Sequence, residues 1–575
     1  MSLSNRAKIC FLVFVVLGVY YPSIFGGVNI VDDAAIIDEF GVNRTATLWE
    51  LLKPGWSFYY RPMVHLSYYL DGVLWGMEES FLHLENILIH TANVVLVFLI
   101  LRRNLCTPAC RNSELPLMLS LLFALHPINT EAVNWIAGRT DPMATFFILC
   151  SLLFLLKGLQ EKRAGYQYLS ALLFLLGLFS KEVAVALLPV VAILFYVEYR
   201  AGKSDTPSPR IIFKSLIPWG IMVLVMTFAL LAHFLFRSDT NNLSKIMQLK
   251  PTDWLGFASV SFSILGFYLK KLFLPLPLSF AISSVSRHYL WFGVPALLLL
   301  LYIISRKRNY APYAAGVLFA LLPAILAVHA RMTWTPVAER YLYLPTAFLV
   351  LGMGAACVSI SSLRRSDALV SVLWILIPIA AFLTVQRNMV WQDNWRLVQD
   401  TIRQSPDFGT LRNGLAHELV KKGDFNEAAD QLEAGIKLNS NNAGDSTSMR
   451  YNLLRVRLKG KSLQDSRALL LTEIGDVRQA ETSLLQILRG VDIQCLSSTA
   501  GPMLGELARE LIQINSVLYD RNGDPFSLYH NGQMYLIIKE KQKAQESFRR
   551  AYVEAPAGAY YKEAAGKLAE RLTKK

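Results

Sequence analysis

The chain has 575 residues, of which 53% are hydrophobic and only 17% are charged, and its mean hydropathy is +0.36. Soluble globular proteins carry about 25% charged residues, so the composition excludes a chain that is soluble throughout. The net charge of +14 does not indicate a nucleic-acid partner, because the basic residues of the N-terminal part stand in short clusters between apolar runs.

Twelve apolar segments follow one another from the N-terminus. They lie near residues 8–24, 81–101, 115–126, 142–157, 166–180, 183–199, 211–236, 254–274, 289–305, 312–329, 341–362 and 367–386. Several are shorter than the ~20 residues of a straight membrane span, so we expect their ends to extend into the flanking residues. No A-x-A-like cleavage site follows the first segment, so we expect it to be retained as a helix.

Clusters of Lys and Arg between the segments predict the orientation, because basic residues beside membrane spans stay in the cytoplasm. The clusters are Arg6/Lys8, Arg102/Arg103/Arg111, Lys157/Lys162/Arg163, Arg200/Lys203/Arg210, Arg306/Lys307/Arg308 and Arg364/Arg365. All fall on one side if the segment 254–274 returns to its own side as a re-entrant or surface helix. We therefore predict eleven crossings, a cytoplasmic N-terminus and a non-cytoplasmic C-terminal part, in the periplasm or the lumen of the endoplasmic reticulum.

Beyond Trp395 the sequence becomes polar, which divides the chain into a membrane domain over 1–390 and a soluble domain over 391–575. Lys422-Gly423-Asp424-Phe425-Asn426-Glu427-Ala428-Ala429 resembles the tetratricopeptide repeat, and weaker copies begin at Gly475 and Lys541. We therefore predict a helical solenoid, which would bind a peptide or a partner protein along its concave face. A plain helical cap on the membrane domain is the alternative.

Two adjacent carboxylates, Asp32 and Asp33, come directly after the first apolar segment. Such a pair could serve as a general base, as a ligand for a divalent metal, or simply as a solvated part of a loop. Ionisable groups near membrane depth are costly, so each is a candidate for function.

The other candidates lie on the segment ends of the predicted outer face. His83 and His90 share one helix stripe with Asn86 and Asn93, which predicts either a site in the bundle interior or hydrogen bonds between helices. Four cations, Arg61, Arg139, Lys181 and Arg340, could together bind a phosphate. Further acids and bases of these loops are His126, Glu131, Asp141, Glu182 and Glu339.

The order of these motifs is similar to that of a known family, the membrane-embedded, tetratricopeptide-containing O-mannosyltransferases of the GT-C class. The motifs are Asp32-Asp33, Tyr60-Arg61-Pro62, Phe81-x-His83-x-x-Asn86-x-x-x-His90, His126-Pro127-Ile128-x-Thr130-Glu131-Ala132-Val133, Gly138-Arg139, Lys181-Glu182 and Ala338-Glu339-Arg340-Tyr341-Leu342-Tyr343-Leu344-Pro345. The resemblance implies an all-α, GT-C-type membrane bundle of about eleven spans, followed by a repeat solenoid.

The resemblance also implies a reaction. The donor would be a polyprenyl-phosphate sugar held in the membrane lipid, which fits the absence of any nucleotide-binding motif, and the acceptor a Ser or Thr hydroxyl of a protein. The hydroxyl would attack the anomeric carbon with inversion, a carboxylate of the Asp32–Asp33 pair would be the base, and the cations would hold the leaving phosphate. Between the two aspartates we lean to Asp33.

Three other interpretations stay open at this point. The acceptor could be a lipid or a glycan. A transporter would also have many spans, but internal repeats of the membrane half, which are expected for that class, are not visible. A membrane-anchored scaffold would need only the repeat domain and would leave the outer acids and bases without a role.

Overall fold

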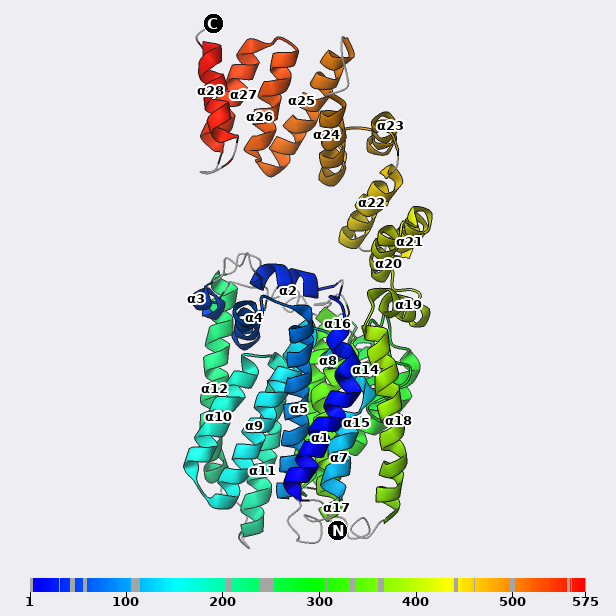
Figure 1. The fold of residues 1–575 in the computed structure, drawn as a ribbon. Helices are drawn as coiled ribbons and strands as arrows, with labels where there is room; N and C mark the ends of the chain where they lie inside the picture. Colours follow the sequence, from blue (N-terminus) through cyan, green and yellow to red (C-terminus); the bar gives the residue numbers. More distant parts are fainter. Residues whose placement is uncertain are drawn as a thin grey trace. The chain divides into compact units, whose positions relative to one another are not determined.

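The computed structural model describes residues 4–29, 31–41, 47–54, 59–104, 114–202, 209–236, 253–306, 308–330, 335, 337–359, 367–438, 443–459, 461–496, 502–555, 559 and 561–573. These residues form helices joined by loops, with one isolated antiparallel bridge between Ile282 and Val337. The chain divides into two compact units, Met1–Phe408 and Gly409–Lys575 (Figure 1).

All twelve predicted apolar segments are helical in the first unit, which confirms the all-α, multi-span fold class. Nine helices of the described residues are long and apolar enough to cross a membrane. They are α1 (Asn5–Tyr20, continued by η1, Tyr21–Phe25), α5 (Glu79–Asn104), α9 (Thr140–Glu161), α12 (Pro209–Phe236), α14 (Trp254–Phe273), α15 (Leu290–Ser305), α16 (Ala311–Ala330), α17 (Tyr343–Ser359) and α18 (Asp367–Trp391). Three shorter apolar helices are α7 (Leu115–Ala124), α10 (Ala164–Leu178) and α11 (Leu187–Gly202).

The helix α14, for which we predict a re-entrant path, is long enough to cross, so its path stays a prediction. It packs closely against α15 through two glycines. A Cβ atom on Gly266 would lie 2.2 Å from the carbonyl oxygen of Tyr289, and one on Gly293 would lie 1.9 Å from that of Phe262. Only glycine therefore permits this backbone contact, as is typical of helix pairs in membranes.

Two ion pairs connect the ends of four helices at one end of the bundle. Lys8 Nζ lies 2.9 Å from Glu114, and Arg103 lies 3.4 Å from Glu161. These residues stand where α1, α5, α7 and α9 begin or end, so the basic clusters beside them share one side. The cluster members Arg111, Lys203, Lys307, Arg364 and Arg365 lie outside the described residues.

The opposite end of the bundle carries short helices, with α2, α3 and α4 far from the N-terminus in Figure 1. Proline at the first turn starts α4 and η2, and a capping box of Thr47 and Glu50 starts α3. The short helices are α2 (Asp33–Phe40), α3 (Leu48–Leu52), α4 (Pro62–Leu74), η2 (Pro127–Asn129), α8 (Thr130–Asn134), η3 (Ala137–Arg139), η4 (Glu182–Ala186), η5 (Arg287–Tyr289) and η6 (Glu339–Leu342).

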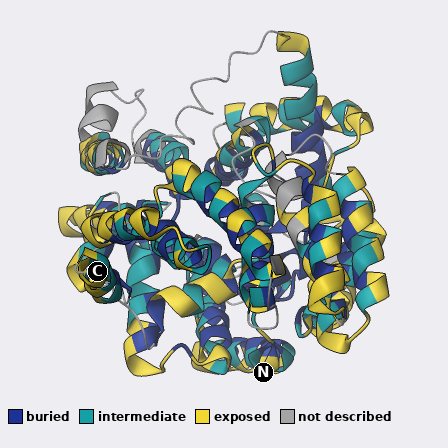
Figure 2. Cartoon of the chain, turned by 90° about the horizontal axis from the view of Figure 1, so that it is seen from above, coloured by how far each residue is buried: buried dark blue, intermediate teal, exposed yellow. Residues whose placement is uncertain are grey.

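Individual helices carry buried and exposed residues side by side (Figure 2). One large apolar core joins residues of α1, α5, α7, α9, α17 and α18. Large apolar side chains such as Trp291 and Leu298 of α15 stay exposed, at 80% and 62%. Exposed apolar side chains along long apolar helices are those that lipid would cover.

The second unit is a series of helices after α19 (Asn394–Gln404), which itself belongs to the first unit. Gly532 lies against Phe548, where an added Cβ would come within 2.6 Å of the ring, so the glycine permits close packing of α26 and α27. The helices are α20 (Thr410–Lys422), α21 (Phe425–Leu438), α22 (Ala443–Leu458), α23 (Leu463–Ile474), α24 (Thr482–Leu496), α25 (Pro502–Asn522), α26 (Pro525–Ile537), α27 (Lys541–Glu554) and α28 (Lys562–Thr573). Their identity as tetratricopeptide-like repeats stays a prediction.

Candidate active site

Asp33, the first residue of α2, has a buried carboxylate with both oxygens engaged. Oδ2 accepts a hydrogen bond from the backbone N–H of Asn29 (3.0 Å), and Oδ1 accepts one from the backbone N–H of Ala137 (2.9 Å). Burial raises the pKa of Asp33 to about 7, against the effect of these two hydrogen bonds. Asp33 therefore fastens the loop before α2 to the η3 turn.

Asp32, its neighbour, is exposed, and no described residue donates a hydrogen bond to its carboxylate. The surrounding protein raises the pKa of Asp32, while the guanidinium of Arg340 lowers it. Of the two adjacent acids, Asp32 is thus the one whose carboxylate is open to a ligand and lies within electrostatic reach of a cation.

Arg139 is fully buried, and all its nitrogen atoms have partners. Nε donates to the side-chain oxygen of Asn86 (2.8 Å), Nη2 donates to the carbonyl oxygen of Leu82 (3.2 Å), and Nη1 pairs with the carboxylates of Asp71 and Glu85. Arg139 thereby joins α4 and α5 to the η3 turn, which also donates the Ala137 N–H to Asp33. Each nitrogen of the buried Arg139 thus has a partner within the protein, and two carboxylates balance its charge.

Arg340 forms a buried ion pair with Glu131. Its Nη1 lies 2.5 Å from Oε1 of Glu131, and its backbone N–H donates to Oε2 at 3.1 Å. The guanidinium stacks between the rings of Trp135 and Tyr341, at 4.9 and 5.0 Å from their centroids. Burial raises the pKa of Glu131, whereas Arg340 lowers it. The pair and the two rings hold the cation in one orientation, within electrostatic reach of Asp32.

Two more cations of the predicted site are also paired. Lys181 Nζ lies 2.6 Å from Oδ2 of Asp141, and both side chains are buried. Arg61 donates from Nη2 to both oxygens of Glu182, at 3.1 and 2.9 Å. The Glu182 side chain is 57% exposed and that of Arg61 16%, so this pair is the one open to solvent.

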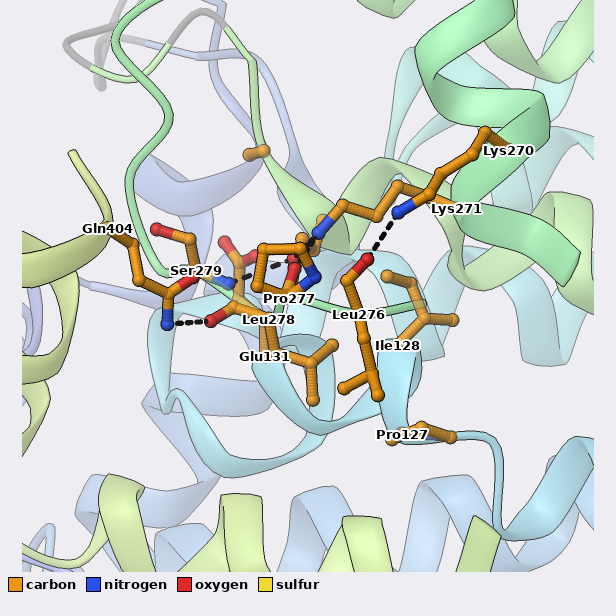
Figure 3. Close-up of polar contacts among 12 residues, drawn as sticks. Pro127, Ile128, Glu131, Lys270, Lys271, Leu276, Pro277, Leu278, Ser279 and Gln404 are labelled. Atoms are coloured by element: carbon orange, nitrogen blue, oxygen red, sulfur yellow. Dashed lines mark hydrogen bonds and ion pairs between the residues drawn. The ribbon is translucent and has the colours of Figure 1, made fainter. Parts of the chain in front are cut away.

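Glu339 belongs to a separate contact around the loop after α14, of which Figure 3 labels Lys270, Lys271 and residues 276–279. Its Oε1 accepts hydrogen bonds from Nζ of Lys271 (2.7 Å) and from the backbone N–H of Ser279 (2.9 Å). Lys270 and Lys271 also donate to the carbonyl oxygens of Leu276 and Pro277. Glu339 therefore fixes the 276–279 loop beside η6, which carries Arg340.

Of the three predicted histidines, His90 and His126 form hydrogen bonds between helices and backbone, whereas the ring nitrogens of His83 are buried without a hydrogen bond from a described residue. His90 lies 2.6 Å from the hydroxyl of Tyr343 and 3.1 Å from the carbonyl oxygen of Ala124, so the hydrogen-bond interpretation of the helix stripe applies to it. His126 Nε2 lies 3.1 Å from the carbonyl oxygen of Leu272, and burial lowers the pKa of His126 to about 4. His83 is buried against Gly26, where an added Cβ would lie 3.3 Å from Nε2.

Several residues of this ionic network were missed by the sequence analysis. Asp71 stands in the stretch Tyr68-Tyr69-Leu70-Asp71, and Lys271 stands near the end of α14. A charge among apolar neighbours was the available signal: Asp71 stands alone, and Lys271 stands next to Lys270. Glu85, Arg387 and Asp400 gave no comparable signal, because each lies among other polar residues.

The predicted alternative of a divalent metal does not fit the residues present. Among the described residues, no three His, Cys, Asp or Glu side chains are grouped so that they could share an ion. Both oxygens of Asp33 face backbone N–H groups, so the aspartate pair does not form a two-carboxylate site.

Comparisons with known proteins identify relatives. Protein O-mannosyl-transferase TMTC1 of Homo sapiens is 24% identical over 438 residues, which are 66% of this chain and 48% of the relative. Protein O-mannosyl-transferase F38B6.6 of Caenorhabditis elegans is 24% identical over 442 residues, 73% of this chain and 61% of the relative. Protein O-mannosyl-transferase tmtc2 of Xenopus laevis is 31% identical over 185 residues, 29% of this chain and 21% of the relative.

No protein-family model matches the chain, and no solved structure matches it significantly. The chain spans about half to three fifths of the length of the first two relatives. The resemblance carried by the sequence motifs is nonetheless confirmed, and the chain is a relative of the TMTC-type protein O-mannosyl-transferases.

Proposed function

We propose that this protein is an inverting glycosyltransferase of the GT-C class. It transfers a hexose such as mannose from a polyprenyl-phosphate donor to a Ser or Thr hydroxyl of a protein, on the non-cytoplasmic face of the membrane. The names of the relatives support transfer to protein, and the apolar helices support a donor that is held in lipid.

The observation that carries the proposal is the exposed carboxylate of Asp32, which no described residue binds and which lies within electrostatic reach of the buried cation Arg340. In the proposed reaction, the acceptor oxygen bonds to the anomeric carbon as the bond from that carbon to the phosphate oxygen breaks. The hydroxyl proton passes to Asp32, and the electron pair leaves with the polyprenyl phosphate. A positioned base and a cation near the leaving oxygen are the two groups that such a displacement needs.

The ion pairs suggest separate roles for the other predicted residues. We assign Arg61, Lys181 and Arg340 to the donor phosphate, since a phosphate can share their N–H groups with Glu182, Asp141 and Glu131. Arg139 has its N–H groups engaged within the protein, so it acts as a positioning residue for the η3 turn. Glu339, His83, His90 and His126 would orient the loops and helices that carry the site.

For the second unit we propose binding of the acceptor polypeptide. A cavity of about 560 Å³ lies among α21, α22, α23 and α24. Leu453, Leu454 and Leu484 form apolar parts of its lining, and Arg457 pairs with Glu433 at 2.6 Å on its charged part. The lining combines apolar with charged side chains, so it could contact both apolar and polar groups of a polypeptide.

The decisive experiment is a transfer assay with purified protein in lipid nanodiscs. The protein is incubated with mannosyl-phosphoryl-polyprenol and either a Ser/Thr-rich polypeptide, a lipid or a glycan acceptor, and products are identified by mass spectrometry. Sugar on the polypeptide, abolished by Asp32→Asn, is the expected result. Sugar on the lipid or glycan alone would refute the protein acceptor, and no product with any acceptor would refute the transferase activity.

The proposed side of the membrane has its own test. Cysteine placed at Glu39 of α2 and at Glu540 before α27, both exposed, should react with a membrane-impermeant maleimide from the non-cytoplasmic side, while cysteine at Gln160 should not. Labelling of the native cysteines is subtracted as a control. Reaction of Glu39 and Glu540 variants from opposite sides would refute the arrangement, since acceptor unit and aspartate loop could not meet.

A further inference from the structure

The loop before the two aspartates accepts hydrogen bonds from a segment near the C-terminal end of the first unit. Asn394 Nδ2 donates to the carbonyl oxygen of Val28 (2.7 Å), and Gln392 Nε2 donates to that of Pro22 (2.7 Å). The backbone N–H of Gly27 donates to the carbonyl oxygen of Gln392 at 3.3 Å. These residues lie between α18 and the start of α19, more than 360 positions along the chain from the loop.

Further hydrogen bonds lie between this anchor and the aspartates, on either side of residue 30, which is outside the described residues. Asn29, which follows Val28, is buried, its N–H donates to Asp33, and its side-chain oxygen accepts the N–H of Val31 (2.9 Å). Gly27 and Val28 are thus anchored at the α18–α19 junction, and Asp33 is anchored at the η3 turn. Asp32 lies between these two anchors; its backbone carbonyl accepts the N–H of Ile36 (3.2 Å), whereas its carboxylate accepts no hydrogen bond from a described residue.

The same helix also contacts the loop beside Arg340. At the end of α19, Gln404 Nε2 donates to the carbonyl oxygen of Leu278 (2.6 Å; Figure 3), and the Ser405 hydroxyl donates to that of Ala281 (2.9 Å). Ser279 of this loop donates its N–H to Glu339, the residue before Arg340. Arg387 pairs with Asp400 at 2.5 Å, which ties α19 back to α18.

We infer that Asn394 and Gln392 are positioning residues for the transfer reaction. By holding the backbone of Gly27 and Val28, they set the position and direction of the Asp32 carboxylate. The inference rests on the proposed function, since it concerns the base of that reaction. Asn394 donates its side-chain N–H to a backbone carbonyl, so the hydrogen bond, and not the volume of the side chain, is the feature that matters. Displacement of a catalytic group by about 1 Å can lower the rate by about a hundredfold.

The test compares two changes at one position with a control in the same helix. Asn394→Ala removes the donor, and Asn394→Asp keeps the shape but replaces the donor by an acceptor that faces the Val28 carbonyl. The control is Thr401→Val, which removes a buried hydroxyl that donates within α19, to Leu397 (2.7 Å). Both Asn394 variants should lower kcat by about tenfold to a hundredfold with less than a twofold change in donor KM, because the cations that bind the phosphate are untouched. Thr401→Val should leave kcat near the wild-type value.

A second measurement does not depend on activity. Hydrogen–deuterium exchange of the peptide covering residues 27–33 should speed up in both Asn394 variants and in Gln392→Ala, but not in Thr401→Val. If exchange is faster in these variants but the wild-type protein transfers no sugar, the proposed function is refuted and the anchor is supported. Unchanged exchange and unchanged kcat in Asn394→Asp would overturn the inference, and so would an equal loss in Thr401→Val, which would indicate general destabilisation of α19.

Discussion

Replacing each of the two adjacent aspartates by asparagine should separate catalysis from loop anchoring. Asp32→Asn keeps the size of the side chain and removes the only carboxylate of the pair that is open to an acceptor. The carboxylate of Asp33 accepts two hydrogen bonds, from the backbone N–H groups of Asn29 and Ala137. Asp33→Asn keeps only one side-chain oxygen that can accept them. We therefore expect unequal losses of turnover from two changes that are chemically the same.

The magnitudes follow from the contacts. General-base catalysis contributes about 10²–10⁴-fold, so Asp32→Asn should lose that much in kcat. Asp33→Asn loses one hydrogen bond of about 0.5–1.5 kcal/mol, which corresponds to roughly two- to tenfold if all of it appears in the activation barrier. The free energy of unfolding does not distinguish the two variants well. In Asp33→Asn the lost hydrogen bond lowers stability, while the removal of a buried charge raises it.

The assay is single-turnover transfer from mannosyl-phosphoryl-polyprenol at saturating acceptor, with donor binding measured separately. Asp38→Asn serves as the control, since Asp38 is an exposed acid of the same short helix α2. Near-normal turnover of Asp32→Asn would refute Asp32 as the base. An Asp33→Asn enzyme that is inactive while it binds donor normally would indicate that Asp33 is the base instead.

Three further predictions follow from the same structure. The folded-state pKa of Asp33 is raised to about 7, so protonation favours the folded state and stability should fall as the pH rises from about 4 through 7. Unfolding temperatures should show this slope in wild type and a shallower slope in Asp33→Asn, in which other buried acids such as Asp71, with its own raised pKa, still contribute. Glu131→Gln leaves Arg340 buried without its counter-charge, so it should cost about 3 kcal/mol and lower the unfolding temperature in detergent, and an unchanged temperature would contradict a buried pair. A chain that ends at Phe408 should bind donor like the full chain but transfer poorly to polypeptide, whereas one that ends before α19 should lose transfer to any acceptor; full activity of both would contradict the roles of α19 and the second unit.

The sequence by itself determined the membrane fold. A bilayer leaves no water for unpaired backbone groups, so each apolar run of sufficient length must be a helix, and all twelve predicted runs are helical. It also indicated which polar residues are important: Asp33, Glu131, Arg139, Lys181 and Arg340 are all buried or nearly so at the predicted loops. Burial of charges at such loops follows from local composition, which is visible in the sequence.

Only the tertiary structure decided what each of these charges does. Asp32 and Asp33 are identical in type and adjacent, so their sequence cannot tell that helix α2 begins at Asp33 and turns that carboxylate inward while Asp32 stays open. Arg139 is a cation at a loop like Lys181, but contacts from α4 and α5 occupy its nitrogen atoms.

The anchor of the aspartate loop has the same origin. Asn394 meets Val28 across 366 residues, and Gln392 meets Pro22 across 370. Hydrogen bonds between backbone carbonyls and amide side chains leave no periodicity or spacing in the sequence, because any residue supplies the carbonyl. They are set by how α1, α18 and α19 pack, and packing of distant helices is a property of the folded chain alone.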